Sequence, residues 1–345
     1  MARKKSGELP SGNVRIRVYD YTGPDGVKHY KSFTAPTRAK AQALVNEWKA
    51  NVRELKENKT IKAAVEDYIN IKRDILSPST IRGYNTHLKH IAEHPISRAE
   101  LASVSNVDIQ SFVSDLMRTG MSPKTVANTY GLLAAALKMY MPGFTLNITL
   151  PAREKPDTYT PSAADVQILL DNCNTTELRI AILFAAVGTM RRGEACAVTF
   201  DDIDYDAGTV RINKAYVKTE DNLWELKAPK TYASYRVIRL PDYVLEAIKS
   251  LDRQEGSVLN MKPDQLYGQF HRAIERAQLP AFRYHDLRHY AASQMHASGV
   301  PDRYIEAMGG WKPGSSVLKR TYENILDVDF VRHQEKFLAN NRFCV

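Results

Sequence analysis

Residues 178–194 read LRIAILFAAVGTMRRGE, an apolar segment that runs directly into a charged one. Nearly every position from Leu178 to Val187 is apolar, which leaves no polar face for water and predicts a helix that is buried on all sides. The following residues, 188–194, place two arginines and a glutamate at the end of that helix. The domain that surrounds such a helix holds these charges at a fixed place.

Residues 161–345, which contain this helix, mix the two types of secondary structure. Short alternating runs predict strands at residues 209–213 and 236–240. Ser162 is placed to cap a helix over residues 164–172, because its hydroxyl can accept from a free amide of the first turn. Further helices are expected at residues 242–251, 264–277, 286–298 and 301–308. This part of the chain therefore predicts a mixed α/β domain.

Residues 58–145 predict a second domain that is almost entirely helical. Apolar side chains recur at helical spacing from Thr60 onward. Two similar stretches, SPST at residues 77–80 and SPKT at residues 122–125, combine a Ser cap with a Pro that favours a helix start. The proline-rich residues 146–160 predict a linker to the mixed domain.

Residues 1–57 predict a third and smaller module. Residues 13–20 and 27–33 each alternate polar and apolar side chains, which indicates two strands joined by a glycine-containing turn. Thr37 is placed to cap a helix over residues 38–56. The expected fold class is thus multidomain and mainly α with small β-sheets (α+β), consisting of a hairpin-plus-helix module, a helical domain and a mixed α/β domain.

The charge is distributed unevenly along the 345 residues. The chain has 48 Lys and Arg against 39 Asp and Glu, a net charge of +9. Residues 1–57 contribute +6, residues 58–150 contribute +3, and residues 151–345 are neutral in sum. A basic surplus favours a polyanionic partner, which we assign to the first 150 residues. The 43% apolar and 25% charged composition excludes wholesale disorder.

Cysteine usage and hydropathy exclude several other classes. Cys173, Cys196 and Cys344 have the spacing of neither a disulfide framework nor a zinc site. The longest apolar run, residues 180–188, is far shorter than the roughly 18 residues of a membrane span. No apolar core follows the basic N-terminus, so no secretory signal is expected. The chain is therefore expected to be cytoplasmic and to have no membrane partner.

Four separated stretches in the C-terminal half carry polar residues in a fixed order. They are GTMRRGE at residues 188–194, APKT at 228–231 followed by SYRVIRLP at 234–241, YHDLRH at 284–289, and GGW at 309–311 with RTY at 320–322. Arranged in this order, they resemble the tyrosine recombinases, the phage-integrase family of site-specific DNA recombinases. The resemblance covers the whole chain in layout and residues 161–322 in motif.

The resemblance implies how the chemistry is divided among the side chains. Tyr322 would be the nucleophile, leaving a 3′-phosphotyrosine and a free 5′-hydroxyl on the DNA. Arg191 and Arg288 would hold the two non-bridging oxygens as negative charge grows in the transition state. Within the arginine doublet, Arg192 is the alternative to Arg191. Glu194 would orient one of the arginines.

The remaining site residues follow from the same resemblance. Lys230 would protonate the leaving 5′ oxygen as a general acid, with Lys227 as the alternative. His285 would accept the proton of Tyr322 or hydrogen-bond the phosphate. Trp311 would donate its indole N–H to a phosphate oxygen, pack in the core, or do both. His289 would support His285 by packing.

No metal ion or other cofactor is expected. The positive charge that Mg²⁺ supplies in other phosphoryl-transfer sites would come here from two arginines and Lys230. A metal pair of His285 and His289 lacks a third ligand at a suitable spacing. Nucleotide hydrolysis is also not required, because the phosphotyrosyl bond stores the energy of the broken diester.

The resemblance also assigns roles to the first two modules. Residues 58–145 would be the core-binding domain and residues 1–57 an arm-type DNA-binding domain. The N-terminus of a helix is a good phosphate-binding site, although helix capping alone also explains the Ser and Thr residues there. A basic strand face, in turn, can simply be exposed to solvent. The expected DNA contacts are Arg15, Arg17, Lys28 and Lys31 on the strands, and Arg82 and Lys124 near the two Ser-Pro caps.

The expected protein is an integrase of a phage or an integrative mobile element. Four protomers would bring together two double-stranded DNA sites, core and arm type, and proceed through a Holliday junction. A host DNA-bending protein and an excision factor are expected partners, and the bacterial nucleoid the expected location. The tail after Tyr322 would dock on a neighbouring protomer or pack on its own domain.

Two other functions are compatible with these residues. A type IB topoisomerase-like enzyme that relaxes DNA uses the same set, although an arm-type domain on a chain this short favours the integrase. A DNA-binding regulator that has the fold but no activity would show a broken catalytic set, and none of the positions is missing here.

Overall fold

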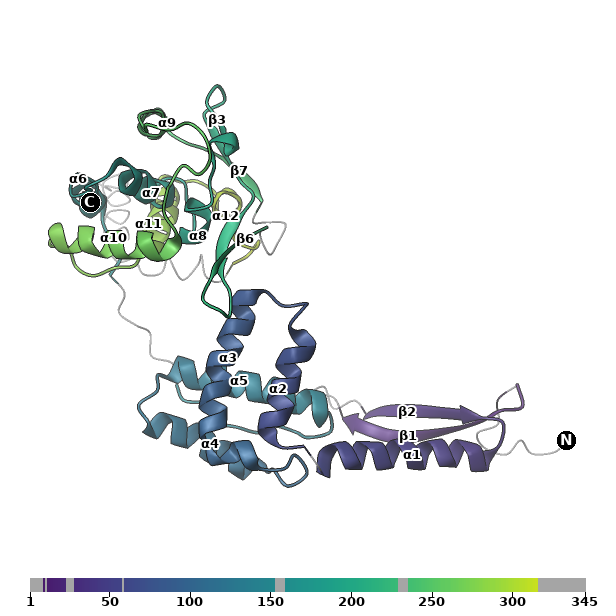
Figure 1. Cartoon of the computed structure of the whole chain (residues 1–345). Helices are drawn as coiled ribbons and strands as arrows, with labels where there is room; N and C mark the ends of the chain where they lie inside the picture. The colour runs from purple at the N-terminus through teal and green to yellow at the C-terminus, as the bar shows by residue number, and fades with distance from the viewer. Residues whose placement is uncertain are drawn as a thin grey trace, which may run out of the picture. The chain divides into compact units, whose positions relative to one another are not determined.

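A computed structural model of the protein describes residue 9 and residues 11–22, 28–57, 59–152, 159–228 and 235–315 (Figure 1). The chain divides into two compact units, residues 1–155 and 156–345, and the division falls inside the predicted linker. No helix among the described residues is long and apolar enough to cross a membrane.

The N-terminal module is a two-stranded antiparallel hairpin covered by one long helix (Figure 1). Strand β1 (Val14–Thr22) pairs with β2 (Lys28–Ala35), and α1 (Arg38–Glu57) packs on one face. Helix α1 begins after Thr37, whose Oγ1 accepts from the Lys40 amide at 3.3 Å. These elements match the predicted strands and helix, while the predicted turn lies outside the described residues.

The four basic residues expected to contact DNA from this hairpin are all exposed, but they do not share one face. Arg15, Arg17 and Lys28 lie on the face turned away from α1, and Lys31 lies on the α1 side with its side chain still exposed, so contact of all four with DNA stays a prediction. The Lys31 Nζ atom is 5.3 Å from the centroid of the Trp48 ring. The reason is the two-residue period of a strand: positions 28 and 31 differ by an odd number and must point to opposite faces.

Residues 59–148 build a helical core of their own. Its elements are α2 (Ile61–Lys72), α3 (Pro78–Glu93), the 3₁₀-helix η1 (Pro95–Arg98), α4 (Asn106–Arg118) and α5 (Pro123–Tyr140). Ile61, Ile91, Phe112 and Leu133 are fully buried among these helices. Apolar spacing therefore predicted these helices correctly, because helix burial follows a 3.6-residue period.

The two Ser-Pro helix starts differ in their caps. Ser122 Oγ accepts from the Thr125 amide at 3.2 Å, as predicted. Ser77 stands at the same place before α3, but its hydroxyl bonds those of Ser79 and Thr80 instead of a backbone amide. Arg82 and Lys124 are exposed in the first turns of α3 and α5. They occupy the predicted positions, and their contact with DNA stays a prediction.

The second unit is organised around α7 (Thr176–Ala186), whose Ile180, Ile182 and Phe184 are fully buried. Helices α6 (Ala163–Asp171), α9 (Asp242–Lys249), α10 (Pro263–Arg276) and α11 (Tyr284–Ala297) all contact it (Figure 1). The apolar segment from residue 178 onward therefore forms the predicted buried helix. The further helices are α8 (Arg192–Ala195), the 3₁₀-helix η2 (Phe200–Asp202) and α12 (Asp302–Gly309).

Two small antiparallel sheets complete this unit. Strands β3 (Ile203–Asp204), β4 (Thr209–Ile212) and β7 (Arg236–Arg239) form one sheet in that order. Strands β5 (Ala215–Lys218) and β6 (Trp224–Lys227) form a separate hairpin, which the sequence did not predict as strands. The mainly helical, multidomain α+β fold class is confirmed.

Candidate active site

The end of α7 is a strained turn that carries the first site residues. Gly188 must be glycine, because a Cβ there would lie 2.7 Å from the Phe184 carbonyl oxygen. Thr189 has φ +53°, a left-handed conformation that costs a residue other than glycine about 1–2 kcal/mol. Its hydroxyl donates to the Met308 carbonyl at 2.8 Å, and its side chain is fully buried. This contact with α12 holds the turn, and the Thr189 carbonyl becomes an acceptor for two arginines.

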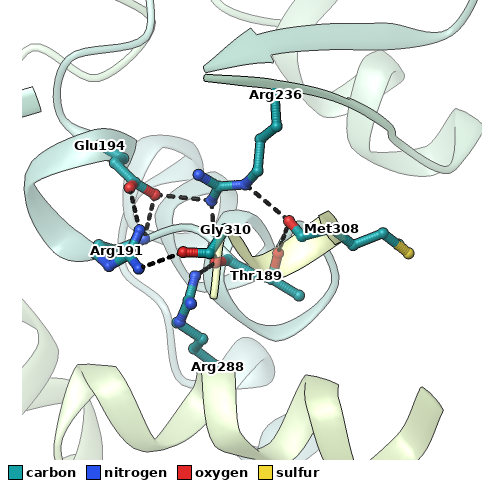
Figure 2. Close-up of polar contacts among 7 residues, drawn as sticks. All are labelled: Thr189, Arg191, Glu194, Arg236, Arg288, Met308 and Gly310. Carbon is teal, nitrogen blue, oxygen red and sulfur yellow. Dashed lines mark hydrogen bonds and ion pairs between the residues drawn. The ribbon is translucent and has the colours of Figure 1, made fainter. Parts of the chain in front are cut away.

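Arg191 is fixed by Glu194, three residues further on (Figure 2). Its Nη1 donates to Glu194 Oε1 at 2.6 Å, and its backbone amide donates to Oε2 at 2.9 Å. Its Nη2 donates to the Gly310 carbonyl at 3.0 Å. The side chain stays 37% exposed, so it is held in place and still accessible to a substrate. Arg192, the alternative in the doublet, lies over the ring of Tyr267 at 5.5 Å.

Arg288 projects from α11 and is completely buried. Its Nη1 donates to the Thr189 carbonyl, and its guanidinium carbon lies 3.8 Å from the centroid of the Trp311 ring. Its Nε and Nη2 have no hydrogen-bond partner within the described residues. Burial, and then the charge of Arg191, lower the pKa of Arg288. A buried cation with two unpaired donors is costly unless an anion pairs with it.

Trp311 lies at the end of α12 and forms one wall of the Arg288 site. The helix ends at Gly310 in the left-handed region (φ +61°), and the Trp311 amide donates to the Glu306 carbonyl at 2.9 Å. The Trp311 side chain is buried, so the predicted packing role is present. Donation from its indole N–H to a phosphate stays a prediction.

We expect Gly309→Ala to displace Trp311. A Cβ on Gly309 would lie 1.9 Å from Cζ3 of the Trp311 ring, a separation that no rotation of a methyl group relieves. Urea unfolding should show a loss of about 1–3 kcal/mol, as overpacking usually costs. The control is Gly268→Ala in α10, where the new Cβ meets only the end of Arg272 and stability should be kept or rise. Equal stability of the two variants would contradict this account.

His285 and His289 lie one turn apart on α11 with their rings edge to face, 4.9 Å between centroids. Lost hydration, then the charges of His289, Arg288 and Arg191, lower the pKa of His285 to about 4. His285 is therefore neutral at pH 7 and able to accept a proton. Burial also lowers the pKa of His289. Among the residues that the structure describes, no group of three His, Cys, Asp or Glu could hold a metal ion.

Arg236, at the start of β7, is a member of this cluster that the sequence analysis did not identify. Its Nη2 donates to Glu194 Oε2 at 2.8 Å and its Nε donates to the Met308 carbonyl at 2.7 Å (Figure 2). Burial opposes ionisation of Glu194, but the bonds and charges of Arg236 and Arg191 outweigh it and lower the pKa of Glu194. The signal was present in the strand pattern: Arg236 shares its face with the buried Ile238.

Two predicted site residues, Lys230 and Tyr322, lie outside the described residues. Lys227, the alternative to Lys230, ends β6 and has its Nζ 3.8 Å from Glu225. Within the described residues, the structure brings together five of the sequence-predicted side chains. They are Arg191, Glu194, His285, Arg288 and Trp311.

Comparisons with known proteins agree with this arrangement. Residues 162–327 match the phage integrase family model. A putative prophage phiRv2 integrase of Mycobacterium tuberculosis (strain ATCC 25618 / H37Rv) is 23% identical over 344 residues, 86% of each chain. A XerC-like tyrosine recombinase of Caldanaerobacter subterraneus subsp. tengcongensis is 22% identical over 358 residues, 89% of this chain and 92% of that protein.

Two solved structures show the same fold. The Tn1549 transposon integrase in complex with transposon right end DNA has a TM-score of 0.66 at 17% identity, over 81% of this chain and 100% of that one. A lambda integrase tetramer bound to a Holliday junction has a TM-score of 0.56 at 15% identity, over 92% of this chain and 96% of that one. The family model matches residues 162–327, which include Arg191 and Arg288, and the relatives align over most of the chain, so this protein is a tyrosine recombinase that carries a phage integrase family domain.

Proposed function

We propose that the protein is a site-specific DNA recombinase, the integrase of a phage or an integrative mobile element, and that Tyr322 forms its covalent bond to DNA. The observation that carries this proposal is the burial of Arg288 together with its two donors that lack a partner among the described residues. Its buried guanidinium presents two unpaired donors beside the partly exposed Arg191. Two guanidiniums in this relation suit the two non-bridging oxygens of one phosphodiester.

The charge balance of the cluster supports phosphoryl transfer. The guanidiniums of Arg191 and Arg236 both bond the single carboxylate of Glu194, and that of Arg288 bonds the Thr189 carbonyl, which Arg236 also reaches (Figure 2). Arg236 and Glu194 form a buried ion pair, which leaves the charges of Arg191 and Arg288 for a ligand. The transition state of diester cleavage carries more negative charge than the diester itself, so fixed cations stabilise it selectively. These side chains supply the charge that a metal ion supplies elsewhere.

The proposed reaction balances in two transesterifications. The Tyr322 oxygen forms a bond to phosphorus while the bond from phosphorus to the 5′ oxygen breaks. The Tyr322 proton passes to neutral His285, and Lys230 protonates the departing 5′ oxygen. The 5′-hydroxyl of a second DNA strand then attacks the phosphotyrosine and releases Tyr322. No energy from nucleotide hydrolysis enters, because one phosphodiester replaces another.

The proposal extends to the assembly on DNA. Residues 1–57 would hold arm-type sites through Arg15, Arg17, Lys28 and Lys31. Residues 58–145 would hold the core site, with Arg82 and Lys124 in contact. A tetramer would exchange strands through a Holliday junction, the state in which the lambda integrase neighbour was solved. A host bending protein, an excision factor and location on the nucleoid are further parts of this proposal.

Wild-type protein should form a covalent adduct with DNA that carries its element's attachment site. The substrate is a suicide duplex with a nick beside the crossover, so that the short cleaved strand diffuses away and the adduct accumulates. Denaturing gels should show the adduct equally with and without EDTA, and the released end should carry a 5′-hydroxyl. Specific binding without any adduct would support the non-catalytic regulator instead, and an adduct that EDTA abolishes would contradict the charge argument.

A further inference from the structure

We infer that Arg236 is a positioning residue for strand cleavage: it fixes Glu194, and through Glu194 it fixes Arg191 against the phosphate. This inference rests on the proposed recombinase function. The Nε and Nη2 donors of Arg236 are already taken by Glu194, Thr189 and Met308, so they are not offered to DNA, whereas Nε and Nη2 of Arg288 have no partner among the described residues. The role of Arg236 is therefore distinct from those of Arg191 and Arg288, which would contact the phosphate.

The contacts of Arg236 join three parts of the site. Its Nη2 reaches Glu194 at 2.8 Å and the Thr189 carbonyl at 3.4 Å, and its Nε reaches the Met308 carbonyl at 2.7 Å. Thr189 is also the acceptor of Arg288, and Met308 lies in α12, whose end carries Trp311. Figure 2 shows the Arg236 guanidinium between these groups. One side chain thereby ties β7 to α8, to the strained turn and to α12.

Glu194 depends on Arg236 because both are deeply buried. Each of the two side chains is only 5% exposed, so water cannot replace the ion pair. The Oε2 atom accepts from Arg236 and from the Arg191 amide, and this fixes the carboxylate plane that Oε1 needs to hold Arg191 Nη1. Without Arg236, the pKa of Glu194 would rise, because a hydrogen bond and a positive charge that lower it are lost while its burial stays. The grip on Arg191 would then loosen.

Lysine cannot reproduce this arrangement. The guanidinium donors are spread over a rigid plane and reach Glu194 and Met308 in different directions, whereas an ammonium is a single point on a flexible stem. The same strand offers a matched control, since Arg239 follows three positions later with its side chain on the exposed face. It adds the same charge to β7 but no contact to Glu194.

The test separates chemistry from DNA affinity. For wild type, Arg236→Met, Arg236→Lys and Arg239→Met, we would measure the rate of adduct formation on the suicide duplex at saturating protein and the Kd for the same duplex. Arg236→Met should cleave about 100-fold more slowly, the cost of a misplaced catalytic group, while its Kd changes by less than about 3-fold. Arg236→Lys should fall between, and Arg239→Met should cleave at the wild-type rate.

A purely structural role predicts a different result. In that case, Arg236→Met would lose cleavage only in proportion to its folded fraction, which circular dichroism measures at the assay temperature. Should Arg236→Met not fold, the double variant Glu194→Gln with Arg236→Met removes both buried charges and should fold, yet cleave slowly. Wild-type cleavage by folded Arg236→Met or by the double variant would overturn the inference. Absence of an adduct with wild type itself would instead defeat the proposed function.

Discussion

Tyr322→Phe is expected to form no covalent protein–DNA adduct at all, which is the largest effect of any single substitution in this chain. The change removes one oxygen, the atom that would attack phosphorus, and keeps the aromatic ring. Cleavage should fall below detection on the suicide duplex, because no other side chain is expected to act as the nucleophile. Binding to the same duplex should be unchanged, since the phenol contributes little to the grip on the DNA backbone.

Tyr304→Phe provides the matched control for this variant. Tyr304 lies on α12 in the same unit with an exposed side chain, so it tests whether any accessible phenol can serve. It should form the adduct at the wild-type rate. An adduct from Tyr322→Phe would show that a different residue is the nucleophile, and mass spectrometry of the DNA-linked peptide would identify it.

The sequence predicted the parts of this site that depend on local spacing. A run of apolar residues longer than two helical turns predicted α7 as a buried helix, which it is. The resemblance led to the expectation that Glu194 orients one of the arginines, and Glu194 forms an ion pair with Arg191. The prediction of α7 needs only the pattern of apolar residues, and that of the Glu194 contact needs only two residues close together in the sequence.

The rest depends on contacts between distant segments. Thr189 adopts a left-handed conformation because its hydroxyl meets the Met308 carbonyl 119 residues later, and no local pattern indicates that. The β5–β6 hairpin has no clean alternation, because every residue of β5 is half buried. Arg236 was overlooked because a charged residue in a strand is ordinarily assigned to the exposed face, whereas here Glu194 neutralises it inside.

The neutral charge sum of the C-terminal half illustrates the same limit. Residues 151–345 carry as many acidic as basic side chains, and this gave no reason to expect an anion site there. The fold nevertheless brings Arg191 and Arg236 onto Glu194 and onto carbonyls at the end of α12, and it places Arg288 beside Trp311. Composition reports the total charge of a segment, while the chemistry depends on which few charges the fold removes from water.

Arg288→Met should have opposite effects on activity and on stability. At saturating DNA, adduct formation should fall about 1,000-fold, because a preorganised donor pair for the growing phosphate charge is lost. The free energy of unfolding should stay the same or rise by about 1 kcal/mol, because methionine fills the space beside Trp311 without two unpaired buried donors. The measurements are single-turnover cleavage and urea unfolding of the same preparation.

The control for Arg288→Met is Leu287→Ala, one residue earlier on α11. Leu287 is fully buried in the apolar core, so its truncation should cost about 2–5 kcal/mol of stability. Below its unfolding transition this variant should still form the adduct. If cleavage fell in proportion to stability in both variants, the role of Arg288 would be structural only. Loss of cleavage with stability kept, seen only for Arg288→Met, requires that the two unpaired donors exist for an anion that arrives from outside the fold.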